Sequence, residues 1–164
     1  MYFTQWKERL TYETLEKTFP GLISGLANHS GIGFVMVKSE QNGPLAIGAE
    51  GIYYLNNDRV EGDNPLLVFG PNAPTHLRRY NGFAYAPDIL VNSFYDPEKG
   101  EIAAFEEKIG SHGGLGGTQS KPFLMYPSHW NLGEDPIVGA EKLHLTLMKQ
   151  LEEERLRSVD HLRT

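Results

Sequence analysis

The spacing of apolar positions changes along the chain, and each spacing predicts a different element. Between residues 11 and 28 the apolar side chains recur every three or four positions, as on one face of an α-helix. They are Leu15, Phe19, Leu22, Ile23 and Leu26. Thr11 suits an N-cap, and Pro20-Gly21 interrupts the pattern. We therefore expect two short helices, or one broken helix, that end at residues 28–31.

From residue 32 the helical spacing gives way to short apolar runs that are separated by turns. Residues 33–37 form a continuous apolar run, which predicts a strand buried on both faces. Further runs at 45–48, 51–55 and 59–60 are joined by turn residues. This order predicts a small antiparallel meander. We also expect Met1-Tyr2-Phe3 to be the tail of a strand.

The second half of the chain alternates strand-like runs with loops. Residues 75–80 predict one or two helical turns, and residues 89–95 predict a strand. The Asp96–Gly100 segment is a turn signal, after which residues 101–105 would return as a second strand. The apolar run 122–127 predicts another strand.

A final helix closes the predicted organisation. Asp135 and Pro136 are suited to an N-cap and a first helical position. Apolar residues then line one face, namely Ala140, Leu143, Leu147 and Leu151. We expect one α/β domain, or a partial domain, over residues 1–164, with a mixed sheet, flanking helices and a small β-meander, and a charged tail over 152–164.

Composition excludes several classes of protein. The chain has 164 residues, of which 40% are hydrophobic and 22% are charged, as in an ordinary globular domain. Its net charge is -6 with no Lys/Arg cluster, which disfavours binding to nucleic acid. No apolar run is long enough to insert in a bilayer, and there is no signal peptide. We expect a soluble chain in the cytoplasm.

The candidate chemistry lies in the glycine-rich segment 109–117, where five of nine residues are glycine and one is His112. Since the chain has no cysteine, any metal must be held by histidine and carboxylate. No HExxH, Walker or GxGxxG pattern accompanies His112, so a metal there needs ligands from elsewhere. The alternative is a histidine in a flexible surface loop.

Other polar residues have simpler interpretations. Asp88 enters an apolar strand and could be a metal ligand, a supporting partner of a ligand, or the cap of the preceding turn. His76 lies near Arg78 and Arg79, where a small phosphate-contacting patch competes with a solvated turn. The remaining histidines are expected to cap a helix, to lie at the surface or to pack under Trp130; they are His29, His129, His144 and His161.

Two motifs carry a resemblance to a known family. Pro87-Asp88-Ile89-Leu90-Val91 is followed about twenty residues later by Gly110-Ser111-His112-Gly113. This pair resembles the C-terminal part of the alkaline phosphatase superfamily, in its branch of type I phosphodiesterases and nucleotide pyrophosphatases. In that branch the histidine is the last ligand of a two-zinc centre. The likeness extends over about residues 1–145 and implies an alkaline phosphatase-like layered fold.

By this resemblance His112 is the metal ligand. Asp88 and Ser111 would support it, and Gly113 and Gly114 would let the backbone approach the metal. The family's early aspartate, its threonine or serine nucleophile and its Asp-His-Gly motif have no counterpart in this chain. One imidazole does not assemble a catalytic zinc site, which needs about three protein ligands.

These departures lead to two hypotheses. In the first, the chain is the C-terminal segment of a metal-dependent phosphodiesterase or phosphatase-like hydrolase, which is inactive alone and binds zinc weakly or not at all. Its partner would be the missing N-terminal part of the same domain. In the second, the chain is a non-catalytic interaction or structural module that forms a homo-oligomer or complements another chain.

Overall fold

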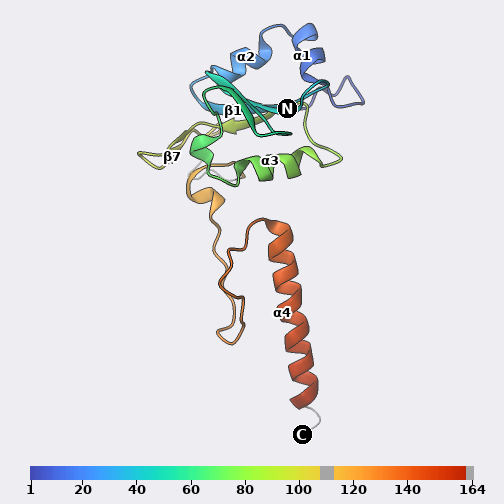
Figure 1. Cartoon of the computed structure of the whole chain (residues 1–164), viewed down its shortest axis with the longest axis vertical. Helices are drawn as coiled ribbons and strands as arrows, with labels where there is room; N and C mark the ends of the chain where they lie inside the picture. Colours follow the sequence, from blue (N-terminus) through green and yellow to red (C-terminus); the bar gives the residue numbers. More distant parts are fainter. Residues whose placement is uncertain (108–112, 162–164) are drawn as a thin grey trace. The chain divides into compact units, whose positions relative to one another are not determined.

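The computed structural model describes residues 1–107 and 113–161, with side chains through residue 157. It divides into two compact units, unit 1 (Met1–Pro122) and unit 2 (Phe123–Thr164) (Figure 1). The helices of unit 1 are α1 (Tyr12–Thr18), α2 (Leu22–Ala27), α3 (Ala73–Asn81) and the short 3-10 helices η1 (Leu67–Phe69) and η2 (Gly117–Ser120). Its strands are β1 (Ile32–Ser39), β2 (Gly43–Ile47), β3 (Gly51–Tyr54), β4 (Arg59–Gly62), β5 (Leu90–Ser93), β6 (Tyr95–Asp96) and β7 (Glu101–Ile102).

The two short N-terminal helices begin where local chemistry predicts. The hydroxyl of Thr11 accepts a hydrogen bond from the backbone N–H of Thr14 and so caps α1. Gly21, with a φ of 79°, turns the chain into α2 through a left-handed conformation that glycine adopts without strain. The expectation of two helices divided at Pro20-Gly21 is confirmed.

The main sheet has the strand order β4-β3-β2-β1-β5, and each neighbouring pair is antiparallel. The predicted meander is therefore confirmed. The prediction of a mixed sheet is wrong for these strands, since the parallel contact is an isolated bridge between Thr11 and Lys38. Met1–Phe3 is also not a strand, because the Phe3 N–H bonds to a side chain, the carboxylate of Asp88, instead of a neighbouring strand.

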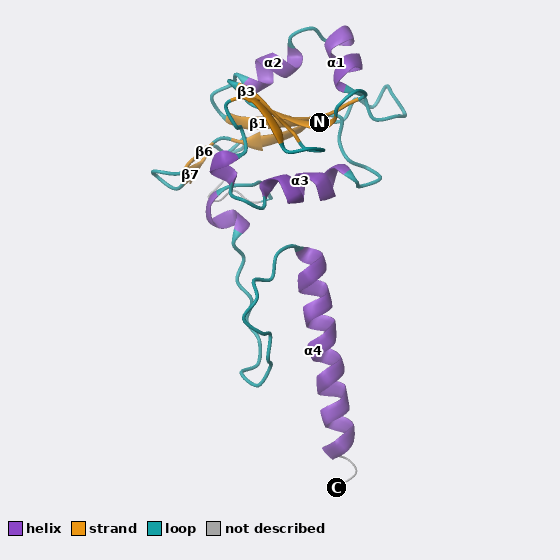
Figure 2. Cartoon of the chain, in the orientation of Figure 1, coloured by secondary structure: helices purple, strands orange, loops and turns teal. Residues whose placement is uncertain are grey.

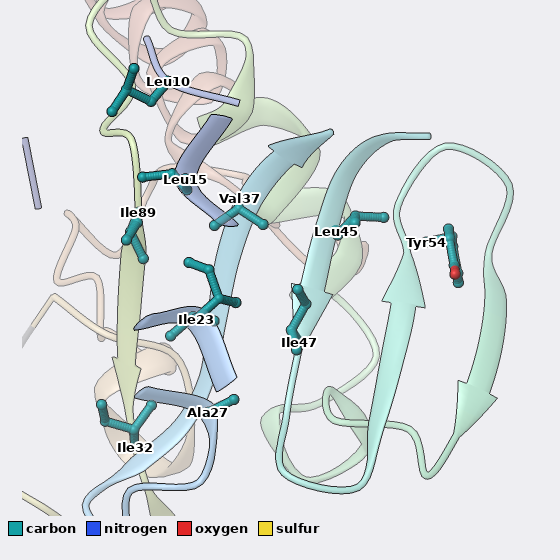
Figure 3. Packing of buried hydrophobic residues seen from close by; sticks show 11 residues of the cluster. Leu10, Leu15, Ile23, Ala27, Ile32, Val37, Leu45, Ile47, Tyr54 and Ile89 are labelled. Carbon is teal, nitrogen blue, oxygen red and sulfur yellow. The ribbon is translucent and has the colours of Figure 1, made fainter. Parts of the chain in front are cut away.

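Helices cover both faces of this sheet. Figure 2 shows α1 and α2 on one face and α3 on the other. The first layer encloses an apolar cluster built by α1, α2 and the sheet, which Figure 3 shows and which includes Leu15, Ile23, Val37 and Ile89. The second cluster lies under α3 and includes Phe34, Phe69 and Leu77. Since β1 contributes to both clusters, it is buried on both faces as predicted.

Helix α3 is fastened to the meander by Arg78. Its guanidinium donates to the carbonyl of Leu55 and pairs with the carboxylate of Asp58. Asp58 also accepts a hydrogen bond from the hydroxyl of Tyr53. These contacts fix the rotation of α3, which in turn sets the position of His76, two residues before Arg78 on the same helix.

Unit 2 consists of α4 (Ala140–His161) and the irregular segment 123–139. The final helix is confirmed, but it begins four residues after Pro136, directly after Gly139, whose φ is 87°. The strand predicted at 122–127 is wrong, because Phe123 and Met125 are 86% and 84% exposed and pair with no described strand. No helix in the described part of the chain combines the length and apolarity needed to span a membrane.

Candidate functional site

The described part of the glycine-rich loop is held on β5 by one buried side chain, Asn92. The Oδ1 atom of Asn92 accepts from the N–H of Leu115 at 2.8 Å, and its Nδ2 donates to the carbonyl of Leu115 at 3.2 Å. Nδ2 also donates to the carbonyl of Ser93 at 3.1 Å. Because Asn92 is only 4% exposed, breaking these bonds would leave buried polar groups without water to replace their partners, which costs free energy. The loop is thus fixed three residues after position 112.

Further contacts hold the loop beyond Leu115. The backbone N–H of Gly116 donates to Oγ of Ser120 at 3.0 Å, and the amide of Gln119 donates to the carbonyl of Leu115 at 3.0 Å. Gly116 has a φ of 106°, and a Cβ there would lie 3.1 Å from the Phe69 and Tyr95 side chains. A larger residue would be strained in its backbone and would push the loop away from these rings.

His112 and Ser111 lie outside the described residues, so their assigned roles stay predictions. Gly113 is described with a φ of 86° and open space where a Cβ would be. Gly114 packs closely, since its Cβ would lie 3.3 Å from Oδ1 of Asn92. The close backbone approach to a metal that was expected at both positions stays a prediction.

Asp88 fastens the N-terminal segment to the start of β5. It is 6% exposed, and its two carboxylate oxygens accept from the backbone N–H groups of Phe3 at 2.7 Å and Leu10 at 2.6 Å. Burial lowers the pKa of Arg9, while the nearby charge of Asp88 raises it. These contacts join Asp88 to the distant N-terminal segment and not to the turn that precedes it, so the role of Asp88 in the described structure is one that the sequence did not indicate.

Two hollows flank the anchored loop on the side of α3. One has a volume of about 300 Å³ and is lined by Asn72, Tyr95, Ser120 and Lys121. The other has a volume of about 360 Å³ and is lined by Leu77, Tyr80, Leu90 and Asn92, and also by Gly113. His76 and Leu115 line both hollows, so the two spaces adjoin at these side chains.

Sequence reasoning underrated two of these residues. A solvated turn is one of the two interpretations given for His76, but the residue lies half-buried on α3 and lines both hollows. Asn92 was not singled out at all. Its signal was present, because it is a polar residue inside the apolar run 89–95 of a predicted strand, where a buried amide needs specific partners.

The described residues do not form a metal site by themselves. Among residues 1–107 and 113–157, no group of three histidine, aspartate or glutamate side chains is placed to hold an ion. His29 instead accepts a hydrogen bond from the N–H of Gly31 at 3.1 Å, so it caps a backbone N–H and not a carbonyl. His144 is exposed on α4, as predicted.

No family model, curated protein or solved structure matches this chain. The functional argument therefore depends on the residues and on the arrangement described above.

Proposed function

We propose that this chain is the C-terminal segment of a metal-dependent hydrolase of phosphoric esters, to which it contributes the last metal-ligating histidine, His112. The fold agrees with the proposal in its coarse class, α/β with helices on both faces of a sheet, but the sheet is antiparallel and not mixed. The proposal itself comes from the resemblance of two motifs, and its main support is the contact between two residues that follow them, Asn92 and Leu115.

The observation that carries the proposal is the pair of hydrogen bonds between Asn92 and Leu115. The Pro-Asp-aliphatic segment leads into β5, which contains Asn92, and the Gly-Ser-His-Gly motif precedes Leu115 by a few residues. Asn92 and Leu115, which follow the two motifs in the sequence, are thus joined although 23 positions separate them. A strand that ends beside a metal-ligating loop is the relation that the resemblance implies.

The chain alone is proposed to be inactive. It has no Asp-His-Gly sequence, and its described residues provide no set of three ligands. A catalytic zinc needs about three protein ligands and an open position, so we derive no catalytic step from this chain. In the proposal, the nucleophile and the remaining ligands come from another segment.

The first experiment titrates the chain with zinc while the histidine ring signals are followed by NMR. We expect weak, saturable binding that selectively moves the His112 ring and is lost in His112→Gln. His144→Gln is the matched control, since His144 is exposed on α4. Zinc that moves all histidine signals alike would contradict the role of His112.

The second experiment measures hydrolysis of an aryl phosphodiester. We expect no turnover by the zinc-loaded chain alone. Robust zinc-dependent hydrolysis that His112→Gln abolishes would overturn the proposal that the other site residues lie elsewhere. An adjacent coding segment with the early aspartate, the nucleophile and Asp-His-Gly would support it.

A second candidate function is a non-catalytic module that self-associates through α4. Leu145, Met148 and Leu156 are each at least half exposed on this helix. Exposed apolar side chains on one element are typical of an interaction surface. Light scattering after size exclusion tests this function: a dimer that Leu145→Glu converts to a monomer supports it, and a monomer at high concentration contradicts it.

A further inference from the structure

Strand β5 is an edge of the main sheet, since it ends the strand order β4-β3-β2-β1-β5. Met1 pairs with the residue just before this strand. Its amino group donates to the carbonyl of Ile89 at 2.6 Å, and its carbonyl accepts from the N–H of Ile89 at 3.4 Å. Backbone groups of alternate residues face the same side of a strand, so those of Val91 and Ser93 also face away from β1.

The outward side of β5 has backbone groups without a partner in the described structure. Among the described residues, no group outside the sheet bonds to the N–H or the carbonyl of Val91, or to the N–H of Ser93. The carbonyl of Ser93 is different, because Nδ2 of Asn92 donates to it at 3.1 Å. Unpaired groups along a sheet edge are a template for another strand.

The hollow of about 360 Å³ lies beside this edge. Its walls include Met1, Leu77, Tyr80, Leu90 and Asn92. Leu90 packs on the cluster under α3, whereas Val91 packs on the cluster under α1 and α2. Residues directly opposite each other on paired strands have their side chains on the same face. A strand added at this edge would therefore place the two neighbours of the residue opposite Val91 on the face of the hollow.

The run Phe123-Leu124-Met125-Tyr126 has strand-like composition but no strand partner in the described single chain. Phe123 and Met125 alternate along it and are 86% and 84% exposed. No described residue forms a backbone hydrogen bond with these four positions. Pro122 and Pro127 bound the run, and proline is tolerated at the end of an edge strand. Each copy of this chain thus carries both an unpaired edge and an unpaired, exposed apolar segment.

We propose that residues 122–125 of a second copy of this chain pair with the edge of β5 as an antiparallel strand. Reciprocal exchange of the segment closes a dimer. Main-chain hydrogen bonds supply the affinity of such a strand addition, and alternate side chains that enter a hollow supply its selectivity. The interface uses neither His112 nor a metal nor α4, so it goes beyond the proposed hydrolase function and is independent of it.

One register satisfies the unpaired backbone groups of β5. Leu124 of the second copy lies opposite Val91, and the two residues exchange N–H···O=C hydrogen bonds. Pro122 of that copy then lies opposite Ser93 and accepts from its N–H. Proline has no N–H to donate. None is needed at this position, because the carbonyl of Ser93 already accepts from Asn92.

The same register fits the side chains and the length of the edge. Phe123 and Met125 of the second copy flank Leu124 and therefore face the hollow, which removes two exposed apolar side chains from water. The added strand ends before Tyr126, because Met1 already occupies the next position along the edge.

The test is amide hydrogen exchange, followed by NMR, on the full 164-residue chain over a range of concentrations. We expect protection to rise at the N–H groups of Val91, Ser93 and Leu124, in step with dimer formation in light scattering. The N–H groups of Phe123 and Met125 face away from β5 in this register and should show no such rise. In a mixture of labelled and unlabelled chains, an isotope-filtered contact between Val91 and Leu124 identifies the second copy as the source of the strand.

Variants of the segment test the hydrogen bonds and the side chains separately. Leu124→Pro removes the donor to Val91 and should weaken dimerisation roughly tenfold. Met125→Asp places a carboxylate against the hollow and should also weaken it. The matched controls are Ser128→Pro and Ser128→Asp, because Ser128 is exposed and lies outside the paired segment. Unchanged spectra of unit 1 show that each variant keeps its fold.

A peptide tests the edge of β5 without any change to the protein. Pro-Phe-Leu-Met-Tyr-Pro, blocked at both ends, copies residues 122–127. It should shift the amide signals of Val91 and Ser93 saturably and convert the dimer to a monomer. The same peptide with N-methylated leucine keeps every side chain but lacks one N–H donor, so it should bind roughly tenfold more weakly.

Several outcomes overturn the proposal. One is a monomer at millimolar concentration, and protection of Val91 and Leu124 in that monomer would place the pairing within one chain. Another is a dimer that Leu145→Glu dissociates and Leu124→Pro does not, which would assign association to α4. A third is equal binding of the two peptides, which would show apolar contact without strand pairing. The zinc titration of His112→Gln is unaffected by these results and tests the hydrolase proposal alone.

Discussion

Units 1 and 2 keep their structure by different means. In unit 1, the side chains at 34–37 of β1 are fully buried between two layers of helices. In unit 2, several large apolar side chains are mostly exposed, and the most deeply buried polar side chain is Gln150. The first unit is therefore stabilised mainly by its apolar core, whereas the second depends more on polar contacts between α4 and the segment before it.

Those polar contacts gather around Glu154 and Gln150. Oε1 of Glu154 accepts from Nε2 of His129 at 2.6 Å and from Nε1 of Trp130 at 3.2 Å. The amide of Gln150 donates to the carbonyl of Asn131 at 3.2 Å. A few exposed hydrogen bonds contribute far less than a buried core, so unit 2 should open at a lower free-energy cost.

The largest expected difference between the units comes from core truncation. Phe34 is fully buried, and its ring packs edge-on against that of Phe69, with 5.1 Å between the ring centroids. Phe34→Ala should lower the free energy of unfolding by about 3–5 kcal/mol, because it leaves a cavity. Leu145→Ala in unit 2 should change it by no more than about 0.5 kcal/mol. Urea unfolding followed by circular dichroism measures both, and similar losses would contradict the comparison.

A smaller effect is expected at the contact that fastens residues 3 and 10 to the start of β5. Asp88→Asn replaces a carboxylate oxygen by an amide N–H₂ opposite a backbone N–H, so one buried donor loses its acceptor. The free energy of unfolding should fall by about 1–3 kcal/mol. Asp135→Asn is the control, because Asp135 is exposed. Equal unfolding midpoints for the two variants would show that the Asp88 contact contributes little.

The smallest expected effect is that of acidic pH on the stability of unit 2. The hydrogen bond from His129 lowers the pKa of Glu154 below its ordinary value of 4.5. The resulting stabilisation is present above pH 4.5 and is lost as the pH falls through the lowered pKa. The protection of the Trp130 indole N–H against exchange, measured relative to the intrinsic rate at each pH, should therefore fall on acidification. Glu154→Gln should show fast exchange already at neutral pH, and an unchanged profile in that variant would contradict the assignment.

Local signals predicted the parts of the fold that are determined by local chemistry. The Thr11 cap, the break at Pro20-Gly21 and the turns of the meander depend on a few neighbouring residues, and each is confirmed. The run at 122–127 has the composition of a strand, but a strand also needs a partner for its backbone groups. Whether a neighbouring strand is available depends on the tertiary structure, and the composition of residues 122–127 does not specify it.

The candidate site was less predictable for the same reason. The glycine content of 109–117 marks the loop, but the anchor of that loop is an amide 23 positions before Leu115. Likewise, the place of His76 between two hollows depends on how Arg78 orients α3 against the sheet. Such relations arise from packing, and one sequence without its fold does not specify them.

The two hydrogen bonds to Asp88 also have a consequence for the order in which parts of the chain are fixed during synthesis. Asp88 follows Leu10 by 78 positions, so at synthesis rates of about 5–20 residues per second it is made roughly 4–16 s later. All residues of β1 to β4 are synthesised before then. During that interval the amides of Phe3 and Leu10 lack their native acceptor, and the first residues to leave the ribosome are among the last to be fixed in place.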